Sequence, residues 1–188
     1  CGGGTFLKLA SELGALVQGV EPSAYATQIA TEQGFKVFNG TMPQFVETFH
    51  HHQFDVITAN HVLEHTPDPV ATLLSIKQVL APDGVAVISV PNADYWACSS
   101  LKGKWHSTDI PRHLLQFNAK SLATCVAESG LQLQSLTTYS LSSAVAQSIR
   151  EWLRFRLFIP YRFLKSVKLI DNIGLELGLF LDRRQIGE

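Results

Sequence analysis

Glycines at the start of the chain, and a glutamate that follows them, have residue types and a spacing that suggest ligand chemistry. The sequence opens with Cys1 and the glycines Gly2 to Gly4, and Glu21 stands 17 positions after Gly4. In nucleotide-binding βαβ units a glycine loop precedes a ribose-binding carboxylate by roughly 20 residues. Glycine lets a ligand approach the backbone because it has no Cβ, and a carboxylate can accept hydrogen bonds from both ribose hydroxyls. This spacing indicates half of an adenosine site.

A second group of ionisable side chains lies in the middle of the chain. His61, Glu64 and His65 are at positions i, i+3 and i+4, which would place them on one face of a helix. Two nitrogen ligands and one oxygen ligand favour a transition metal over magnesium. The same residues also suit hydrogen bonding without a metal, and we predict that no metal is bound.

Alternating helices and strands must position these residues. Apolar periodicity, glycines and N-cap residues predict helices at 5–13, 22–33, 43–49, 70–80 and 119–129. Short apolar runs predict strands at 16–20, 35–38, 54–60, 85–90 and 131–139, with a turn at 82–84 before the fourth of them. This order indicates an open parallel sheet covered by helices on both faces.

Small or polar residues follow four of these strands. They are Glu21, residues 40–42, residues 60–61 and residues 91–92. Ligands of open α/β sheets bind outside the carboxyl ends of the strands, so we expect these four positions to line one site.

Composition limits the classes of function. The 188 residues are 46% hydrophobic and 16% charged, with a net charge of −1, which predicts one globular domain that does not bind nucleic acid. Cys1, Cys98 and Cys125 lack the pair spacing of a zinc site or a disulfide framework, which fits a reducing cytoplasm. The sequence contains no run of about 20 apolar residues, so we expect no membrane-spanning helix.

The motifs together resemble class I S-adenosylmethionine-dependent methyltransferases. The matching stretches are CGGGTFL (1–7), GVEP (19–22), FDVI (54–57), HVLEH (61–65) and LAPDG (80–84). A later stretch, IPRHLLQF (110–117), resembles the ubiquinone-biosynthesis-like small-molecule branch. The resemblance implies an α/β, Rossmann-like, doubly wound and mostly parallel sheet that lacks its first and last strands in this chain. It divides the chain into a methyltransferase core at 1–140, which carries a lid at 92–117, and a helical extension at 141–188.

The resemblance also implies S-adenosylmethionine as the cofactor. Seven residues match positions that contact it in the family: Gly2, Gly4, Glu21, Thr41, Met42, Asn60 and His61. By this match the two glycines pass the methionine part, and the glutamate holds the ribose hydroxyls. The threonine and methionine flank the adenine, and the asparagine and the first histidine lie under the sulfonium end. The family often has an acidic residue where Thr41 stands, which affects recognition of the adenine amine.

The implied activity is methyl transfer to a small-molecule acceptor, at oxygen or carbon. An oxygen nucleophile must lose a proton, and histidine is the commonest base near neutral pH. The candidates are His65, His106 and His113, and the sequence does not choose among them. Two alternatives are a catalytically silent binding domain with the same fold and a nicotinamide-dependent oxidoreductase. The oxidoreductase is disfavoured because this sequence lacks the third glycine of the G-x-G-x-x-G spacing.

The extension combines basic and aromatic residues. Within 148–170, arginines and lysines alternate with tryptophan, phenylalanine and tyrosine, and Pro160 should divide the segment into two helices. A basic amphipathic helix can lie on an anionic membrane surface, or it can pack against the core or in a homodimer. We therefore expect a cytoplasmic protein with possible membrane or lipid-substrate contact through this segment.

Overall fold

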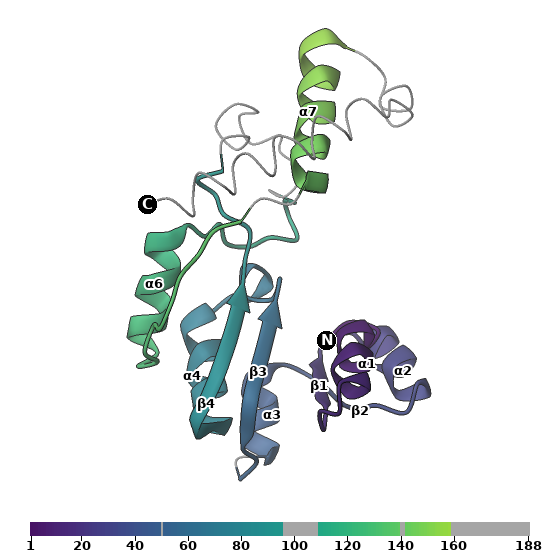
Figure 1. The fold of residues 1–188 in the computed structure, drawn as a ribbon, viewed down its shortest axis with the longest axis vertical. Coiled ribbons are helices and arrows are strands. Elements are labelled where there is room, and N and C mark those ends of the chain that lie inside the picture. The colour runs from purple at the N-terminus through teal and green to yellow at the C-terminus, as the bar shows by residue number, and fades with distance from the viewer. Residues whose placement is uncertain (50, 96–108, 140–141, 159–188) are drawn as a thin grey trace. The chain divides into compact units, whose positions relative to one another are not determined.

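The computed structural model describes residues 1–49, 51–95, 109–139 and 142–158 (Figure 1). The chain divides into two compact units. The first unit consists of Cys1–Ala59, Asp68–Ile88 and Glu128–Leu131, and the second of Asn60–Pro67, Ser89–Ala127 and Gln132–Glu188.

The first unit begins with the predicted alternation of helices and strands. Its elements in order are α1 (Thr5–Glu12), β1 (Gln18–Glu21), α2 (Ala24–Glu32), β2 (Lys36–Asn39) and α3 (Met42–Phe49). The side chain of Ser23 caps α2 by accepting a hydrogen bond from Ala26 N, and Gly34, at φ +90°, follows the end of that helix. Local sequence signals therefore set both ends of α2.

The strands β1 and β2 pair in parallel. Glu21 lies opposite Asn39 in the register, so the carboxyl ends of both strands meet at one edge. The Gly40 amide donates to the Glu21 carbonyl oxygen at 3.0 Å and continues the ladder by one residue. Glu21 is thus the last residue of a strand whose end is fixed by its neighbour.

A second parallel pair follows in the chain. It contains β3 (Phe54–Asn60) and β4 (Leu80–Ser89), which are connected through the 3₁₀ helix η1 (Leu63–His65) and α4 (Pro69–Val79). The Asp68 side chain caps α4 by accepting from Ala71 N at 2.8 Å, with Pro69 in the first turn, as predicted. Both strands run in the same direction (Figure 1), with Gly84 beside Phe54 and Ser89 beside His61.

A hydrophobic core joins the elements of the first unit. Phe45 and Val46 of α3 and Val79 of α4 are buried at its centre. Partly buried side chains of β1, β2, α3 and β3 pack against them: Val20, Phe38, Met42, Phe49, Phe54 and Ile57. This shared core explains why short strands with few ladder hydrogen bonds hold their positions.

The Rossmann-like alternation is confirmed, with the described strands arranged as two parallel pairs. The predicted turn at 82–84 is wrong, because β4 begins at Leu80, directly after α4, and runs through these residues. A Cβ on Gly84 would lie 2.9 Å from the Phe54 carbonyl oxygen and 3.0 Å from that of Ala81, so this glycine permits close approach of the backbone.

The predicted strand at 131–139 is also wrong, since these residues form neither helix nor strand. A strand is stable only when a neighbour satisfies its backbone groups, and no described strand pairs with this segment. One of its contacts is between side chains, where Tyr139 Oη lies 3.2 Å from Ser89 Oγ.

The second unit contains α6 (Ala119–Glu128, whose last residue belongs to the first unit) and α7 (Ser142–Leu157). The two ends of the predicted lid meet, because Asn92 and Phe117 form an isolated parallel bridge. Residues 96–108 of that lid, and residues 159–188 with the predicted break at Pro160, lie outside the described residues. Among the described helices, none combines the length and apolar character needed to cross a bilayer.

Candidate functional site

The carboxylate of Glu21 closes the glycine loop onto the end of β1. Its Oε2 accepts hydrogen bonds from Gly2 N at 2.7 Å and from Cys1 N at 3.0 Å, and its Oε1 accepts from Ser23 N at 2.9 Å. A carboxylate has about four acceptor positions, so about one remains for a ligand hydroxyl.

These contacts determine the charge of Glu21. Partial burial raises the pKa of this carboxyl. Hydrogen bonds from the Ser23 and Gly2 amides and from the Cys1 nitrogen lower it by more than burial raises it, so the pKa lies below the ordinary value of 4.5. Glu21 is therefore ionised at neutral pH and able to accept hydrogen bonds from a polyol.

Gly4 and Gly2 have different structural roles in the loop. Gly4 adopts φ +90° at the start of α1, and a Cβ there would lie 3.1 Å from the Phe35 ring and 3.2 Å from Ala30 Cβ. Gly2 adopts φ +57°, but a Cβ there would meet no atom within 4 Å. Gly4 is thus required by packing, whereas the backbone at Gly2 is open to approach.

The residues after β2 are held by local hydrogen bonds. Gln44 Oε1 accepts from both the amide and the hydroxyl of Thr41, at 2.8 and 3.0 Å. Met42 packs against the core of the first unit. Adenine contact by Thr41 and Met42 stays a prediction.

In the second unit, His61 has an unusual backbone at the end of β3. It adopts φ +53°, a left-handed conformation that is uncommon for residues other than glycine, and its amide donates to the Ser89 carbonyl oxygen at 2.9 Å. Its imidazole is 59% exposed, and its Nδ1 lies 3.1 Å from Glu64 Oε1. Asn60, just before it, is also exposed.

Glu64 lies within η1 and is almost completely buried. Its side chain is 1% exposed, and its second oxygen, Oε2, has no hydrogen-bond partner within the described part of the chain. Its backbone carbonyl accepts from the amides of Leu114 and Leu115, at 2.8 and 3.2 Å. The segment 112–115 is therefore fastened to η1 through Glu64.

This attachment brings His113 next to His65. Their ring centroids are 4.7 Å apart in an edge-on arrangement. His65 Nδ1 lies 2.9 Å from the carbonyl oxygen of Arg112. Because a carbonyl only accepts, Nδ1 must carry a hydrogen, and in the neutral ring Nε2 holds the lone pair.

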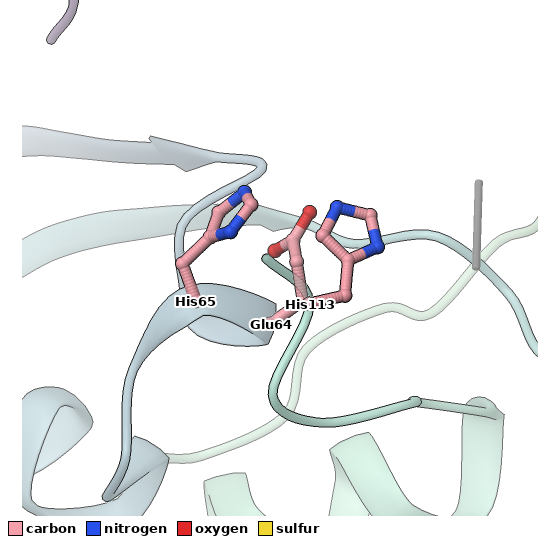
Figure 2. Close-up of side chains that lie close together, drawn as sticks. All are labelled: Glu64, His65 and His113. Carbon is pink, nitrogen blue, oxygen red and sulfur yellow. The ribbon is translucent and has the colours of Figure 1, made fainter. Parts of the chain in front are cut away.

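The side chains of Glu64, His65 and His113 point toward one another (Figure 2). Each offers one nitrogen or oxygen donor atom, and these atoms lie within 4.8 Å of one another, a spacing that would also admit a cation. Sequence reasoning did not find this set. It expected His61, Glu64 and His65 on one helical face, but η1 begins at Leu63 and His61 precedes it.

Asp109 stabilises the turn that carries His113. Its Oδ1 accepts from Arg112 Nη2 and Nε, at 2.8 and 3.2 Å, and its Oδ2 lies 4.0 Å from His113 Nε2. The hydrogen bond from Arg112 lowers the pKa of Asp109, and this outweighs the desolvation that raises it. An ionised carboxylate therefore borders the histidine pair.

The predicted base candidates are thus divided. The structure brings His65 and His113 together, and His106 lies outside the described residues. The sequence had grouped Glu64 with His61 and His65, and the spacing of these residues gave no sign that His113 joins Glu64 and His65.

Solved structures of similar fold agree with this architecture. A SAM dependent methyltransferase from Archaeoglobus fulgidus has a TM-score of 0.62 at 19% identity, with 74% of this chain and 62% of that chain covered. A possible histamine N-methyltransferase from Thermotoga maritima has a TM-score of 0.54, also at 19% identity, over 69% and 59% of the two chains. These similarities establish the fold class, that of SAM-dependent methyltransferases.

The family follows from the sequence comparison. The methyltransferase domain family model matches residues 1–136, so the chain belongs to that family. A ubiquinone biosynthesis O-methyltransferase of Actinobacillus pleuropneumoniae serotype 5b (strain L20) is 38% identical over 101 residues, which cover 49% of this chain and 43% of that protein. The Pasteurella multocida (strain Pm70) protein of the same name is 28% identical over 165 residues, covering 73% and 68%. The match to the first of these relatives spans less than half of its length.

Proposed function

We propose that this protein transfers a methyl group from S-adenosylmethionine to a hydroxyl oxygen of a small molecule. Membership of the methyltransferase domain family and the O-methyltransferase names of similar proteins support this proposal. They do not favour a nicotinamide-dependent oxidoreductase or a silent binding domain. The observation that carries the proposal is the ionised carboxylate of Glu21 beside the open glycine backbone of Gly2.

The binding residues follow from that geometry. The remaining acceptor position of Glu21 takes a ribose hydroxyl, and the open backbone at Gly2 admits the methionine part. Gly4 shapes the loop, and Thr41, Met42, Asn60 and His61 complete the proposed set on family resemblance. When bound, the cofactor supplies an electrophilic methyl group, so the protein's contribution is to align the acceptor and remove its proton.

His65 is the proposed base. Its Nδ1 is held by the Arg112 carbonyl, which leaves the Nε2 lone pair available, and its side chain is exposed to an incoming acceptor. His113 is 9% exposed and faces Asp109, so it is less accessible to an acceptor hydroxyl.

The extension offers a surface for a finer proposal. The described end of α7 presents Trp152 and Leu157 to solvent, together with Arg154. We assign contact with an anionic membrane surface to residues 148–170. Sedimentation with vesicles of anionic and of neutral lipid tests this, and equal recovery with both would exclude charge-dependent contact. A dimer in sedimentation velocity without vesicle binding would favour the homodimer.

Calorimetry with S-adenosylmethionine, followed by mass spectrometry of a phenol incubated with the cofactor, tests the main proposal. We expect saturable binding and a methyl ether product. His65→Gln should lower turnover by about 100-fold with little change in cofactor affinity, and His113→Gln should lower it less. Absence of cofactor binding would reject the proposal, and equal turnover of His65→Gln and the unchanged protein would reject the base.

A further inference from the structure

The buried carboxylate of Glu64 is not explained by packing alone. Burial of an ionised oxygen without a hydrogen-bond partner is unfavourable, and an isosteric apolar side chain would avoid this cost. Glu64 is 1% exposed, and its Oε2 has no partner among the described residues. A group kept in that state is a candidate for a task that arises only during a reaction.

The surroundings of Glu64 indicate the nature of this task. Its Oε1 is engaged by His61 Nδ1 at 3.1 Å, on one side of the carboxylate. The carboxylate also lies between His65 and His113 (Figure 2), and the ligand atoms of the three side chains are within 4.8 Å of one another. The other charged groups beside the pair, Asp109 and Arg112, form an ion pair with each other at 2.8 Å. Asp109 Oδ2 also lies 4.0 Å from His113 Nε2, whereas Glu64 is the buried carboxyl group that faces both rings, with Oε2 unpartnered among the described residues.

We propose that Glu64 is a positioning residue that offsets the positive charge formed on His65 during methyl transfer. This rests on the proposed function. In that step the acceptor oxygen bonds to the methyl carbon while the carbon–sulfur bond breaks, and its electron pair remains on sulfur. The hydroxyl proton moves to His65 Nε2, and the resulting imidazolium later releases it to solvent. Glu64 does not touch the acceptor, and it acts through the two rings that it faces.

The arrangement suits this role because its other parts are already fixed. The Glu64 carbonyl holds the Leu114 and Leu115 amides, and the Arg112 carbonyl holds His65 Nδ1. The carboxylate is therefore placed before the acceptor arrives, and no reorganisation is needed when charge develops. A short-lived cation next to a buried anion is stabilised more strongly than it would be in water.

The test compares Glu64→Gln with the matched variant Glu32→Gln in the full chain. Glu32 is an exposed carboxylate on α2 whose side chain accepts from Gln28 at 2.8 Å. Methyl transfer is measured with phenols whose ring substituents make the hydroxyl weakly or strongly acidic, and S-adenosylmethionine affinity is measured by calorimetry. We expect Glu64→Gln to lower kcat about 30-fold with weakly acidic phenols and only a few-fold with phenols that ionise without help. Glu32→Gln should match the unchanged protein.

Each other outcome overturns the proposal. Equal losses with both kinds of phenol mean that Glu64 has only a structural role, and no loss means that it has none in catalysis. Loss of turnover after chelator treatment, restored by a divalent metal alone, means that the three side chains hold a metal ion. If Glu64→Gln does not fold, Glu64→Asp is measured instead. Because it keeps the charge, its kcat must depend on phenol acidity as that of the unchanged protein does, and a different dependence overturns the proposal. Failure of the unchanged protein to bind the cofactor rejects the proposed function instead.

Discussion

Two glutamates near strand ends have opposite surroundings. Glu21 closes β1, and its carboxylate accepts three hydrogen bonds from backbone nitrogens. Glu64 follows β3 in η1, with one oxygen held by His61 and the other without a hydrogen-bond partner in the described ranges. A carboxylate satisfied by the backbone is suited to constant ligand contact, whereas one left unsatisfied is suited to a charge that appears briefly.

The largest expected difference between the two glutamates is in cofactor affinity. Glu21→Leu removes a charged acceptor for the ribose, and hydrogen bonds to charged groups contribute about 1.5–3 kcal/mol. We expect S-adenosylmethionine affinity measured by calorimetry to fall by about 10- to 100-fold. The comparison fails if Glu64→Leu lowers affinity as much as Glu21→Leu does.

Stability should change in opposite directions. Glu21→Leu leaves the Gly2 and Ser23 amides without their acceptor, which should lower the free energy of unfolding by about 1 kcal/mol. Glu64→Leu removes a buried oxygen without a partner and should raise it by about 1 kcal/mol. Urea denaturation measures both, and a large loss of stability in Glu64→Leu would show that the free oxygen has a structural partner.

The pH dependence of stability sharpens the account of Glu21. Because folding lowers the pKa of Glu21 below 4.5, its contribution is fully present above that pH and is lost as the pH falls through the folded-state pKa. The difference in unfolding free energy between the unchanged protein and Glu21→Gln should therefore shrink between neutral pH and pH values below 4.5. A constant difference would mean that the hydrogen bonds, and not the charge, stabilise the loop.

The smallest expected effect concerns the turn beside Glu64. Arg112→Ala should raise the pKa of Asp109 toward its ordinary value of 3.8, because the guanidinium that lowers it is gone. Carboxyl titration by nuclear magnetic resonance measures this shift. Arg154→Ala, which removes a guanidinium that pairs with Glu151, is the control and should leave Asp109 unchanged.

Local signals made the alternation of elements readable from the sequence. Asp68 and Ser23 accept from the first turns of their helices as their residue types predict, and the strand at 54–60 has the predicted bounds. The predictions of a turn at 82–84 and a strand at 131–139 are wrong because local propensity does not include the pairing of a segment with neighbouring strands. Residues 82–84 belong to β4, and no described strand pairs with residues 131–139.

The candidate sites were readable only in part. The spacing of Gly4 and Glu21 predicted half of an adenosine site, which stays a prediction, and it did not indicate the hydrogen bond from the Gly2 amide to the Glu21 carboxylate. The encounter of Glu64 and His65 with His113 depends on contacts between residues 47 or more positions apart, such as His65 with Arg112. Periodicity and motif spacing carry no information about such long-range contacts.

The attachment between η1 and residues 112–115 uses two backbone carbonyls, with that of Glu64 accepting from the Leu114 and Leu115 amides and that of Arg112 accepting from His65 Nδ1. The side chain of Leu114 takes no part in these hydrogen bonds, so it can vary while the His65 imidazole stays in place. Leu114, which is exposed, is a position where directed evolution could retune the choice of acceptor without rebuilding the catalytic group.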